Sequence, residues 1–292
     1  MQITIQNWLN ELKVQGLSDE TIRAYEWQIQ KLVAALPQKT PIKKIKRKMI
    51  VTYLAERRET GWGDSTRKLA LNAMRSFFKY AVGETKSPVR DIPIPRPKKK
   101  LKRTLTERQA YDVLTLLDTS SPTGVRNLAL LTIMLDTGLR AKEICAIRLD
   151  QLDLESGTLI VKIKGGDDGI AVFTDYTANC VRMWLAVRET SAMKDVKTLF
   201  VSIGGNTPGQ SLTKEGLKCI FRAIARQVGL EKFSPHDMRR SFATLATIFG
   251  APTELLRIAG RWNDLDTLIR YTQAVRAVEI KKYLPVQKLM EI

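Results

Sequence analysis

The chain has 292 residues, of which 44% are hydrophobic, and it carries a formal net charge of +18. This length fits two ordinary domains, since a domain takes about 100 to 200 residues. No stretch reaches the roughly 18 consecutive apolar residues of a membrane helix, and residues 1–5 lack the basic and apolar regions that begin a secretory leader. The sequence therefore predicts a soluble protein of the cytoplasm.

The cysteine and histidine content limits metal chemistry. Cys145, Cys180 and Cys219 form no CxxC pair, and His236 is the single histidine. A disulfide framework, a zinc knuckle and a multi-histidine metal site are not indicated, which disfavours a metal-dependent nuclease. We expect buried free thiols, no metal and no other cofactor.

The positive charge is concentrated in the first third of the chain. Residues 1–103 hold 23 Lys and Arg against 9 Asp and Glu, whereas the rest holds 25 against 21. Basic proteins of this size gain affinity for phosphate polyanions through counterion release. We therefore expect nucleic acid as the partner, gripped mainly by the first third.

Residues 4–86 have apolar side chains at intervals of three and four, which predicts four helices. Residues 18–21 and 64–66 have the composition of helix starts, and residues 40–41 begin a connector. We predict a helical DNA-binding domain over residues 1–86.

Two basic runs lie in this part of the chain. The first comprises Lys43, Lys44, Lys46, Arg47 and Lys48. The second comprises Arg96, Lys98, Lys99, Lys100, Lys102 and Arg103. Solvated surface charge is the simpler interpretation of the first run. The second run follows three prolines, so we predict that residues 87–104 form a linker lying along the phosphate backbone, with an inert spacer as the alternative.

Residues 105–292 predict a second domain of helices with a small β element. After a helix start at residues 104–107, a helical period continues to residue 117 and resumes over 126–135. The β-branched run 158–164 leads through a glycine-rich turn into 170–173, which predicts a hairpin. Helices are expected over about 175–188, 214–228 and 234–248.

Two helix starts in this domain carry cationic side chains. Gly138 ends one predicted helix and Arg140 opens the next, which places the guanidinium beside free backbone amides. Farther along, Ser234 is expected to cap a helix in a capping box with Asp237. His236 and Arg239 then project from one face beside the positive end of that helix. An ordinary ion pair and a structural histidine are the alternatives.

Taken with residues 259–272, these segments resemble the successive boxes of the tyrosine recombinase (phage integrase) family, in the correct order. The pattern is TGLR..E, a lysine in a β hairpin, HxxR, and His or Trp nine residues before a nucleophilic tyrosine. The matching positions are Arg140 with Glu143, Lys164, His236, Arg239, Trp262 and Tyr271.

The chain departs from this pattern at three places. Arg240 stands where a second histidine is common, and Gly260-Arg261-Trp262 replaces Leu-Gly-His. Lys162 shares a strand face with Lys164 and remains the alternative hairpin lysine.

The resemblance covers nearly the whole chain. It implies a mainly α fold with a small β hairpin, in which a helical core-binding domain and a mixed α/β catalytic domain over residues 105–292 form a two-domain DNA clamp. It also implies that Tyr271 forms a 3′-phosphotyrosyl link, that Lys164 protonates the leaving 5′ oxygen, and that His236 assists proton transfer. Arg140, Arg239 and the Trp262 indole would bind the phosphate, with no metal or nucleotide.

Site-specific recombination is therefore the predicted function, with a double-stranded recombination site as the partner. Whether the reaction is integration, excision or resolution stays open, as does the target sequence. We expect a monomer in solution that forms dimers or tetramers on DNA, coupled through the apolar tail 275–292; folding of that tail back onto its own domain is the alternative. A type IB topoisomerase would use the same chemistry, and a non-catalytic DNA-binding regulator would need only the charge and the helices.

Overall fold

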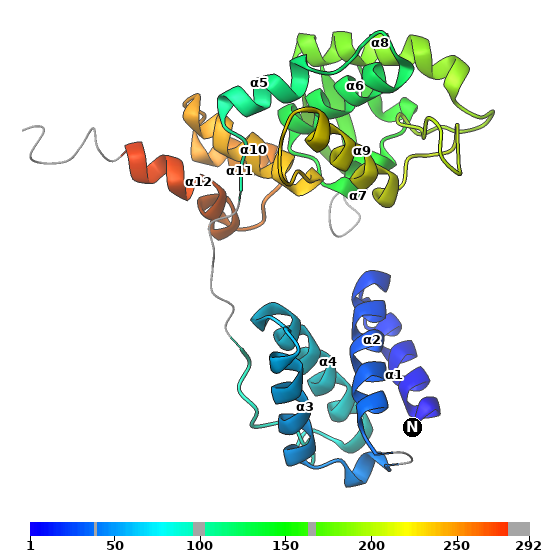
Figure 1. Ribbon diagram of the computed structural model, residues 1–292, viewed down its shortest axis with the longest axis vertical. Coiled ribbons are helices and arrows are strands. Elements are labelled where there is room, and N and C mark those ends of the chain that lie inside the picture. The colour runs from blue at the N-terminus through cyan, green and yellow to red at the C-terminus, as the bar shows by residue number, and fades with distance from the viewer. Residues whose placement is uncertain (38–39, 96–102, 163–167, 280–292) are drawn as a thin grey trace, which may run out of the picture. The chain divides into compact units, whose positions relative to one another are not determined.

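A computed structural model describes residues 1–37, 40–95, 103–162 and 168–279 of the chain. The chain divides into two compact units, Met1–Lys100 and Leu101–Ile292 (Figure 1). Within the described ranges no helix is both long and apolar enough to cross a membrane. The fold class is as predicted, mainly helical with one small antiparallel sheet.

The N-terminal unit is a bundle of helices around one apolar core. Its elements are α1 Gln2–Val14, α2 Asp19–Ala35, the 3-10 helix η1 Ile42–Lys44, α3 Arg47–Glu59 and α4 Asp64–Val82. The Ser18 hydroxyl accepts a hydrogen bond from the Thr21 backbone N–H, which confirms the predicted start of α2. At the centre, Trp8 is 1% exposed and donates its indole N–H to the Ser76 hydroxyl at 3.1 Å.

The chain continues to pack against this bundle after α4. Val89 and Ile92 are buried in the same core, and the Arg75 guanidinium donates to the Ile92 carbonyl at 2.7 Å. Of the second basic run, the members from Arg96 to Lys102 lie outside the described residues. Arg103 is the first described residue of the next unit.

The second unit contains eight helices and three strands among its described residues. The helices are α5 Glu107–Thr115, α6 Pro122–Thr137, α7 Ala141–Ala146, α8 Asp175–Ser191, α9 Lys214–Gln227, α10 Pro235–Ile248, α11 Thr253–Ala259 and α12 Leu265–Glu279. The strands are β1 Leu152–Asp153, β2 Thr158–Lys162 and β3 Asp168–Val172. A 3-10 helix, η2 Leu149–Gln151, precedes β1.

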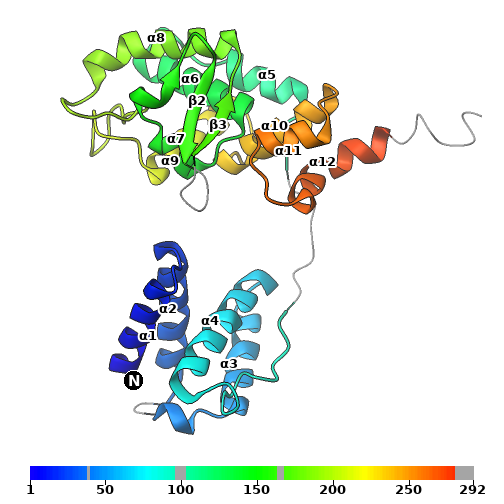
Figure 2. The ribbon, with the colours of Figure 1, turned by 180° about the vertical axis from the view of Figure 1, so that it is seen from behind.

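Helix α6 is the centre of this unit. It is buried along nearly its whole length and packs against α8 and α10 (Figure 2). Because helix α6 is surrounded by other elements, its sequence is apolar on all sides instead of amphipathic. Its C-terminus, where the first box begins, is therefore fixed in the core of the unit.

The predicted hairpin is present. Strands β2 and β3 pair antiparallel in the register Thr158↔Val172 to Lys162↔Asp168, and β1 pairs with the other edge of β2. Leu159 and Val161 point into the core, so Lys162 lies on the outer face. Lys164 falls outside the described residues.

A second, smaller apolar cluster joins the last three helices. It consists of Phe242, Ala243, Leu256, Trp262 and Leu268 from α10, α11, α12 and the loop between them. Helix α11 was not among the predicted elements, because seven residues are too few to display a helical period. This cluster is separate from the main core that contains α6.

The three cysteines are free, as expected. Cys180 is buried and Cys145 is half-buried, but Cys219 is exposed on α9. The expectation of buried thiols is therefore wrong for Cys219, which lies on the outer face of an amphipathic helix.

Candidate active site

Arg140 lies where α6 ends and α7 begins. Gly138 adopts the left-handed conformation, with a φ of 60°, and so ends α6 without the steric penalty of a side chain. The Arg140 guanidinium, with a side chain 46% exposed, donates to Glu143 Oε1 at 2.7 Å. Glu143 Oε2 accepts the Arg140 backbone N–H at 2.8 Å. Arg140 therefore opens α7 as predicted, with its guanidinium accessible to an anion.

The start of α10 differs in one detail from the expected capping box. Pro235 occupies the first turn as predicted, but the Ser234 hydroxyl makes no capping bond to the backbone. It donates to Asp237 Oδ2 at 2.6 Å, because a charged carboxylate is a strong acceptor. The other Asp237 oxygen is held by Arg240. The helix still begins where the sequence predicts.

Arg239 is buried on the inner side of α10. Its side chain is among the largest fully buried ones, and the residue is 2% exposed. The guanidinium donates to the carbonyls of Gly138 and Gly260, the latter at 2.6 Å, and lies 4.6 Å from the centre of the Trp262 ring. Burial lowers the pKa of Arg239 to about 10, which still leaves it charged at neutral pH. A fixed cation is thereby held between the ends of α6 and α11.

His236 and Tyr271 approach each other although they are 35 residues apart. The Tyr271 hydroxyl lies 3.3 Å from His236 Nε2, and the two rings are nearly perpendicular. Desolvation, together with the charges of Arg240 and Arg239, lowers the pKa of His236 below its ordinary 6.5. The imidazole is therefore neutral at pH 7 and can accept a proton from the phenol.

Besides this contact with His236, Tyr271 is held against α10 by a hydrogen bond to its backbone carbonyl and by aromatic packing. The Thr244 hydroxyl donates to the Tyr271 carbonyl at 2.9 Å. The Tyr271 ring meets the Trp262 ring edge-on, with centroids 6.0 Å apart. Trp262 in turn stacks on Phe242 and lies directly over Gly260, where any Cβ would overlap the indole.

Two further arginines belong to this neighbourhood and were not assigned a role from sequence. Arg240 is 8% exposed, pairs with Asp237 and donates to the Arg103 carbonyl at 2.8 Å. Arg261 is also buried, with a φ of 55° and a hydrogen bond to the Thr137 carbonyl at 3.0 Å. The only sequence signal was that both depart from the family pattern.

Most of the predicted residues thus come together. Arg140 acts electrostatically on both His236 and Arg239, so these three and the two aromatic residues form one site. Lys162 is 64% exposed and pairs across the hairpin with Asp168 at 2.7 Å. Strand β3 contacts α11, which brings the hairpin to the same side of the unit.

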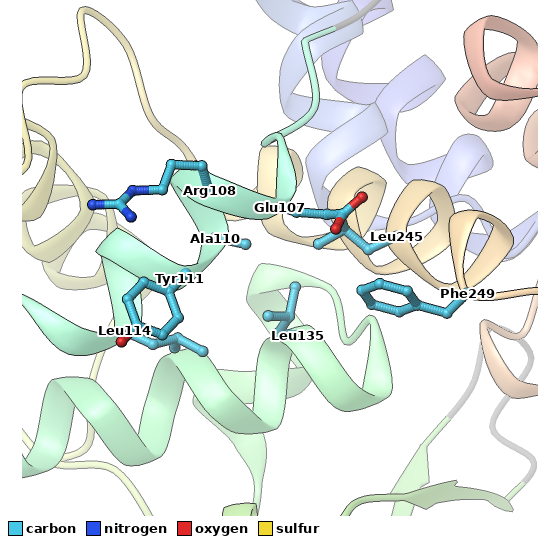
Figure 3. A pocket seen from close by; sticks show the side chains of 8 residues that line it. All are labelled: Glu107, Arg108, Ala110, Tyr111, Leu114, Leu135, Leu245 and Phe249. Carbon is cyan, nitrogen blue, oxygen red and sulfur yellow. The ribbon is translucent and has the colours of Figure 1, made fainter. Parts of the chain in front are cut away.

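An open apolar hollow of about 720 Å³ lies elsewhere on the second unit. Side chains from α5, α6 and α10 line it (Figure 3). Tyr111 and Phe249 are its most exposed apolar members, at 60% and 72%. The hollow contains none of the predicted site residues, so we regard it as a surface for packing and not for chemistry.

Comparison with known proteins identifies the class. The model of the phage integrase family matches residues 103–277, and that of the phage integrase N-terminal SAM-like domain matches residues 5–85. The first match alone covers more than half of the chain. The chain therefore belongs to the phage integrase family, and within it to the tyrosine-type site-specific recombinases that resemble the Xer proteins.

Relatives and solved structures agree with this placement. Tyrosine recombinase XerD of Listeria monocytogenes serotype 4b (strain F2365) is 30% identical over 94% of this chain and 95% of its own length. Tyrosine recombinase XerC of Thermodesulfovibrio yellowstonii is 27% identical over 93% and 91%. The XerH site-specific recombinase bound to the palindromic difH substrate shares the fold, with a TM-score of 0.72 and 22% identity over 91% of this chain and 80% of that chain.

Proposed function

We propose that this recombinase cuts and rejoins DNA through a 3′-phosphotyrosyl intermediate on Tyr271. The observation that supports this most directly is the 3.3 Å approach of the Tyr271 hydroxyl to a neutral imidazole. A tyrosine phenol ordinarily ionises near pH 10 and is a poor nucleophile at neutral pH unless a base removes its proton. His236 Nε2 is placed to accept that proton as the oxygen attacks phosphorus.

Arg140 and Arg239 would bind the two non-bridging oxygens of the scissile phosphate. Negative charge concentrates on those oxygens in the pentacoordinate transition state, and guanidinium groups can meet them bidentately. Arg239 is already fixed by two carbonyls, so it needs little reorganisation when the charge develops. The arginines thereby supply the charge stabilisation of the step from the chain itself.

The leaving group is the 5′ oxygen of the next nucleotide. Its bond to phosphorus breaks as the bond from Tyr271 forms, and it must receive a proton, for which we propose Lys164. Lys162, the alternative, is engaged with Asp168 at 2.7 Å, which supports the assignment to Lys164. One phosphodiester replaces another of similar energy, so the religation step can run the sequence in reverse without a nucleotide.

Trp262 would complete the phosphate site. Its indole N–H is buried and has no hydrogen-bond partner among the described residues. An unsatisfied buried donor costs about 1–3 kcal/mol, so a phosphate oxygen that accepts this N–H would recover that energy. Such a bond requires a small opening of the indole edge on DNA binding.

The first basic run is proposed to contact the phosphate backbone. All five of its cationic side chains are exposed, and three of them occupy residues 46–48 at the start of α3. Cations at a helix N-terminus are disfavoured by the helix dipole, whereas a phosphate is favoured there. A DNA phosphate bound at the start of α3 would offset the repulsion between these cations and the positive end of the helix dipole.

A salt titration of the full chain tests that interaction. Replacing residues 46–48 with glutamine should reduce the slope of log affinity against log salt by about 0.9 for each phosphate that the run no longer neutralises. A matched variant with glutamine at Lys194, Lys197 and Lys218, three exposed cations of the second unit, should retain the slope. If the slope changed equally in both variants, the proposal that this basic run binds DNA would be rejected.

Assembly on DNA is proposed to couple the active sites. Solved relatives include a lambda integrase dimer bound to a COC' core site, with a TM-score of 0.73 and 15% identity. We propose that this chain is a monomer in solution, a dimer on a full site and a tetramer on two sites. The apolar residues of the tail 276–292 would dock on a neighbouring subunit. The hollow of Figure 3 offers an apolar surface of suitable chemistry.

A gel-shift titration tests this assembly. Deleting residues 276–292 should leave binding to a single half-site nearly intact and abolish cooperative filling of the second. Phe249→Glu, in the exposed wall of the hollow, should have the same effect if the hollow receives the tail. Cooperative filling by the truncated protein would place the coupling elsewhere.

The chemical proposal is tested by trapping the intermediate. A nicked suicide site, whose leaving fragment diffuses away, should yield a covalent protein–DNA adduct with the native chain. Tyr271→Phe should abolish the adduct and keep DNA affinity, because only one oxygen is removed. Peptide mapping must find the DNA on Tyr271; attachment to Tyr176 or Tyr283, the alternative tyrosines, would refute the assignment.

A further inference from the structure

Arg261 adopts a backbone conformation that an arginine normally avoids. Its φ is 55°, in the left-handed region, directly after the last turn of α11. A non-glycine residue in this region loses about 1–2 kcal/mol relative to right-handed backbone. Asp195 is the other described residue of this kind, and it is exposed. The side chain of Arg261 must therefore make interactions that offset its backbone.

Those interactions reach across the fold to the segment that carries Arg140. The Arg261 side chain is only 8% exposed. Its guanidinium donates to the Thr137 carbonyl at 3.0 Å, 124 residues away in sequence, and lies 3.9 Å from Glu143 Oε2. A further bond goes to the Ala259 carbonyl at 2.9 Å, and Nε has no partner among the described residues.

Glu143 is consequently shared between two arginines. Both carboxylate oxygens bind Arg140, Oε1 through the guanidinium and Oε2 through the backbone N–H. Arg261 Nη2 lies 3.9 Å from the same Oε2. If Arg140 were its only partner, the carboxylate would neutralise the cation that a phosphate needs. With Arg261 present, the three groups together carry a net positive charge.

Arg239 adds a further positive charge beside Arg140, Glu143 and Arg261. It responds electrostatically to Arg140, Glu143 and Arg261, so all four groups lie close together. Burying two guanidinium groups beside each other is unfavourable unless an anion compensates them. A single carboxylate provides only part of that compensation, and a bound phosphodiester would supply the rest.

We propose that Arg261 is a positioning residue for phosphate binding: it pairs with Glu143, fixes the Arg140 guanidinium through that carboxylate and leaves the Arg140 charge available to the scissile phosphate. This inference rests on the proposed function, in which Arg140 binds that phosphate. Arg261 itself acts through Glu143, since its own contacts are with protein atoms.

The test is Arg261→Gly, assayed for single-turnover cleavage of the suicide site. Glycine is the residue that a φ of 55° favours, so the backbone is relieved while the guanidinium is lost. We expect the cleavage rate to fall on the order of 10- to 100-fold, with DNA affinity changed by less than about threefold. Asp195→Gly, which relieves the other such backbone, is the matched control and should cleave at the native rate.

A second substrate separates this role from mere loss of structure. A methylphosphonate at the scissile position replaces one charged oxygen with a methyl group, so a cationic site matters less there. The rate difference between the native chain and Arg261→Gly should shrink to less than about threefold on that substrate. In an Arg140→Ala background, Arg261→Gly should likewise have little further effect, because residues that act as a unit are not additive.

The outcomes are distinguishable from failure of the proposed function. If the native chain forms no adduct on Tyr271, the proposed function fails. If the native chain forms the adduct and Arg261→Gly cleaves at the native rate, only the role of Arg261 is refuted. An equal rate loss on the charged and the neutral substrate would also refute it, since that result describes structural damage alone.

Discussion

The cationic side of the active site and the nucleophile side are held in different ways. Arg239 and Arg261 are buried and bonded to backbone carbonyls at the ends of α6 and α11. Tyr271 is half-buried; the Thr244 hydroxyl binds its carbonyl, His236 contacts its hydroxyl, and its ring packs against a five-residue apolar cluster. The charges are therefore preorganised for the transition state, whereas the attacking oxygen can be moved at small energetic cost.

The reason for this difference lies in the two cores. Helix α6, which supplies Gly138 and Thr137, is packed into the main core of the unit. Among the described residues, helix α12, which carries Tyr271, packs mainly on α10. Local opening of α12 needs far less free energy than displacement of α6.

The largest expected effect on the cleavage rate comes from Arg239→Lys, which removes a guanidinium from the preorganised cationic side of the active site. Lysine keeps the charge, but its compact ammonium lacks the planar, spread donors with which the guanidinium reaches the Gly138 carbonyl, the Gly260 carbonyl and a phosphate. We expect the cleavage rate to fall on the order of 10³-fold, or about 4 kcal/mol. Arg226→Lys on the exposed face of α9 is the control. A native cleavage rate for Arg239→Lys would show that charge alone suffices.

Gly138→Ala should be the next most damaging, because it alters the backbone on which Arg140 and Arg239 depend. The added methyl would overlap the Phe242 ring, and the φ of 60° disfavours any side chain. We expect a loss of about 2–4 kcal/mol in the free energy of unfolding, measured by urea denaturation. Gly250→Ala has a similar φ but no atom within 4 Å, so it should lose only about 1 kcal/mol. Equal losses would mean that the overlap is absent.

A smaller, local effect is expected from Leu268→Ala, which weakens the nucleophile side. Leu268 is fully buried in the small cluster, so its truncation should destabilise α12 by about 2 kcal/mol and speed hydrogen exchange there. Leu131→Ala, fully buried in the main core, should instead lower the unfolding free energy of the whole unit by about 3–5 kcal/mol. If Leu268→Ala also lowers exchange protection in α6, the two cores are one cooperative unit.

The smallest effect concerns His236, which lies between the two sides. Because it is the single histidine of the chain, an NMR titration reports its protonation without ambiguity. Desolvation and the neighbouring arginines place the native midpoint below 6.5, whereas the urea-unfolded chain should titrate near 6.5. A native midpoint at or above that of the unfolded chain would contradict the proposed base.

The same shift fixes the sign of a pH effect on stability. The unfolded chain binds a proton at His236 more readily than the folded chain, so this group makes no difference well above pH 6.5. As the pH falls below that value, protonation increasingly favours the unfolded state, and the loss is complete below the folded pKa. Cleavage by the free enzyme should also decline on this acid limb, as His236 becomes unable to accept a proton.

The helices were predictable because residues near each helix start, chiefly capping residues, determine where the helix begins. Thr106 forms a capping box with Gln109, and Ser121 and Thr213 accept bonds from backbone amides at the starts of α6 and α9. The spacing of His236 and Arg239 predicted a shared face for the same reason. Local signals of this kind do not depend on the rest of the fold.

What sequence could not predict depends on tertiary contacts. Ser234 has the composition of a capping residue, yet its hydroxyl is taken by the Asp237 carboxylate that Arg240 holds in place. Arg261 appears from sequence only as a departure from the family pattern, and its distant partners explain the burial of its side chain. The expected hairpin lysine, Lys164, lies outside the described residues.

The end of the interdomain linker is tied to α10 at two adjacent positions. The Arg240 guanidinium donates to the Arg103 carbonyl at 2.8 Å, and the Ser241 hydroxyl accepts the Leu105 backbone N–H at the same distance. Arg239, the fixed cation of the site, immediately precedes this pair in the chain. A mechanical load on the linker thus enters the catalytic unit one residue from Arg239.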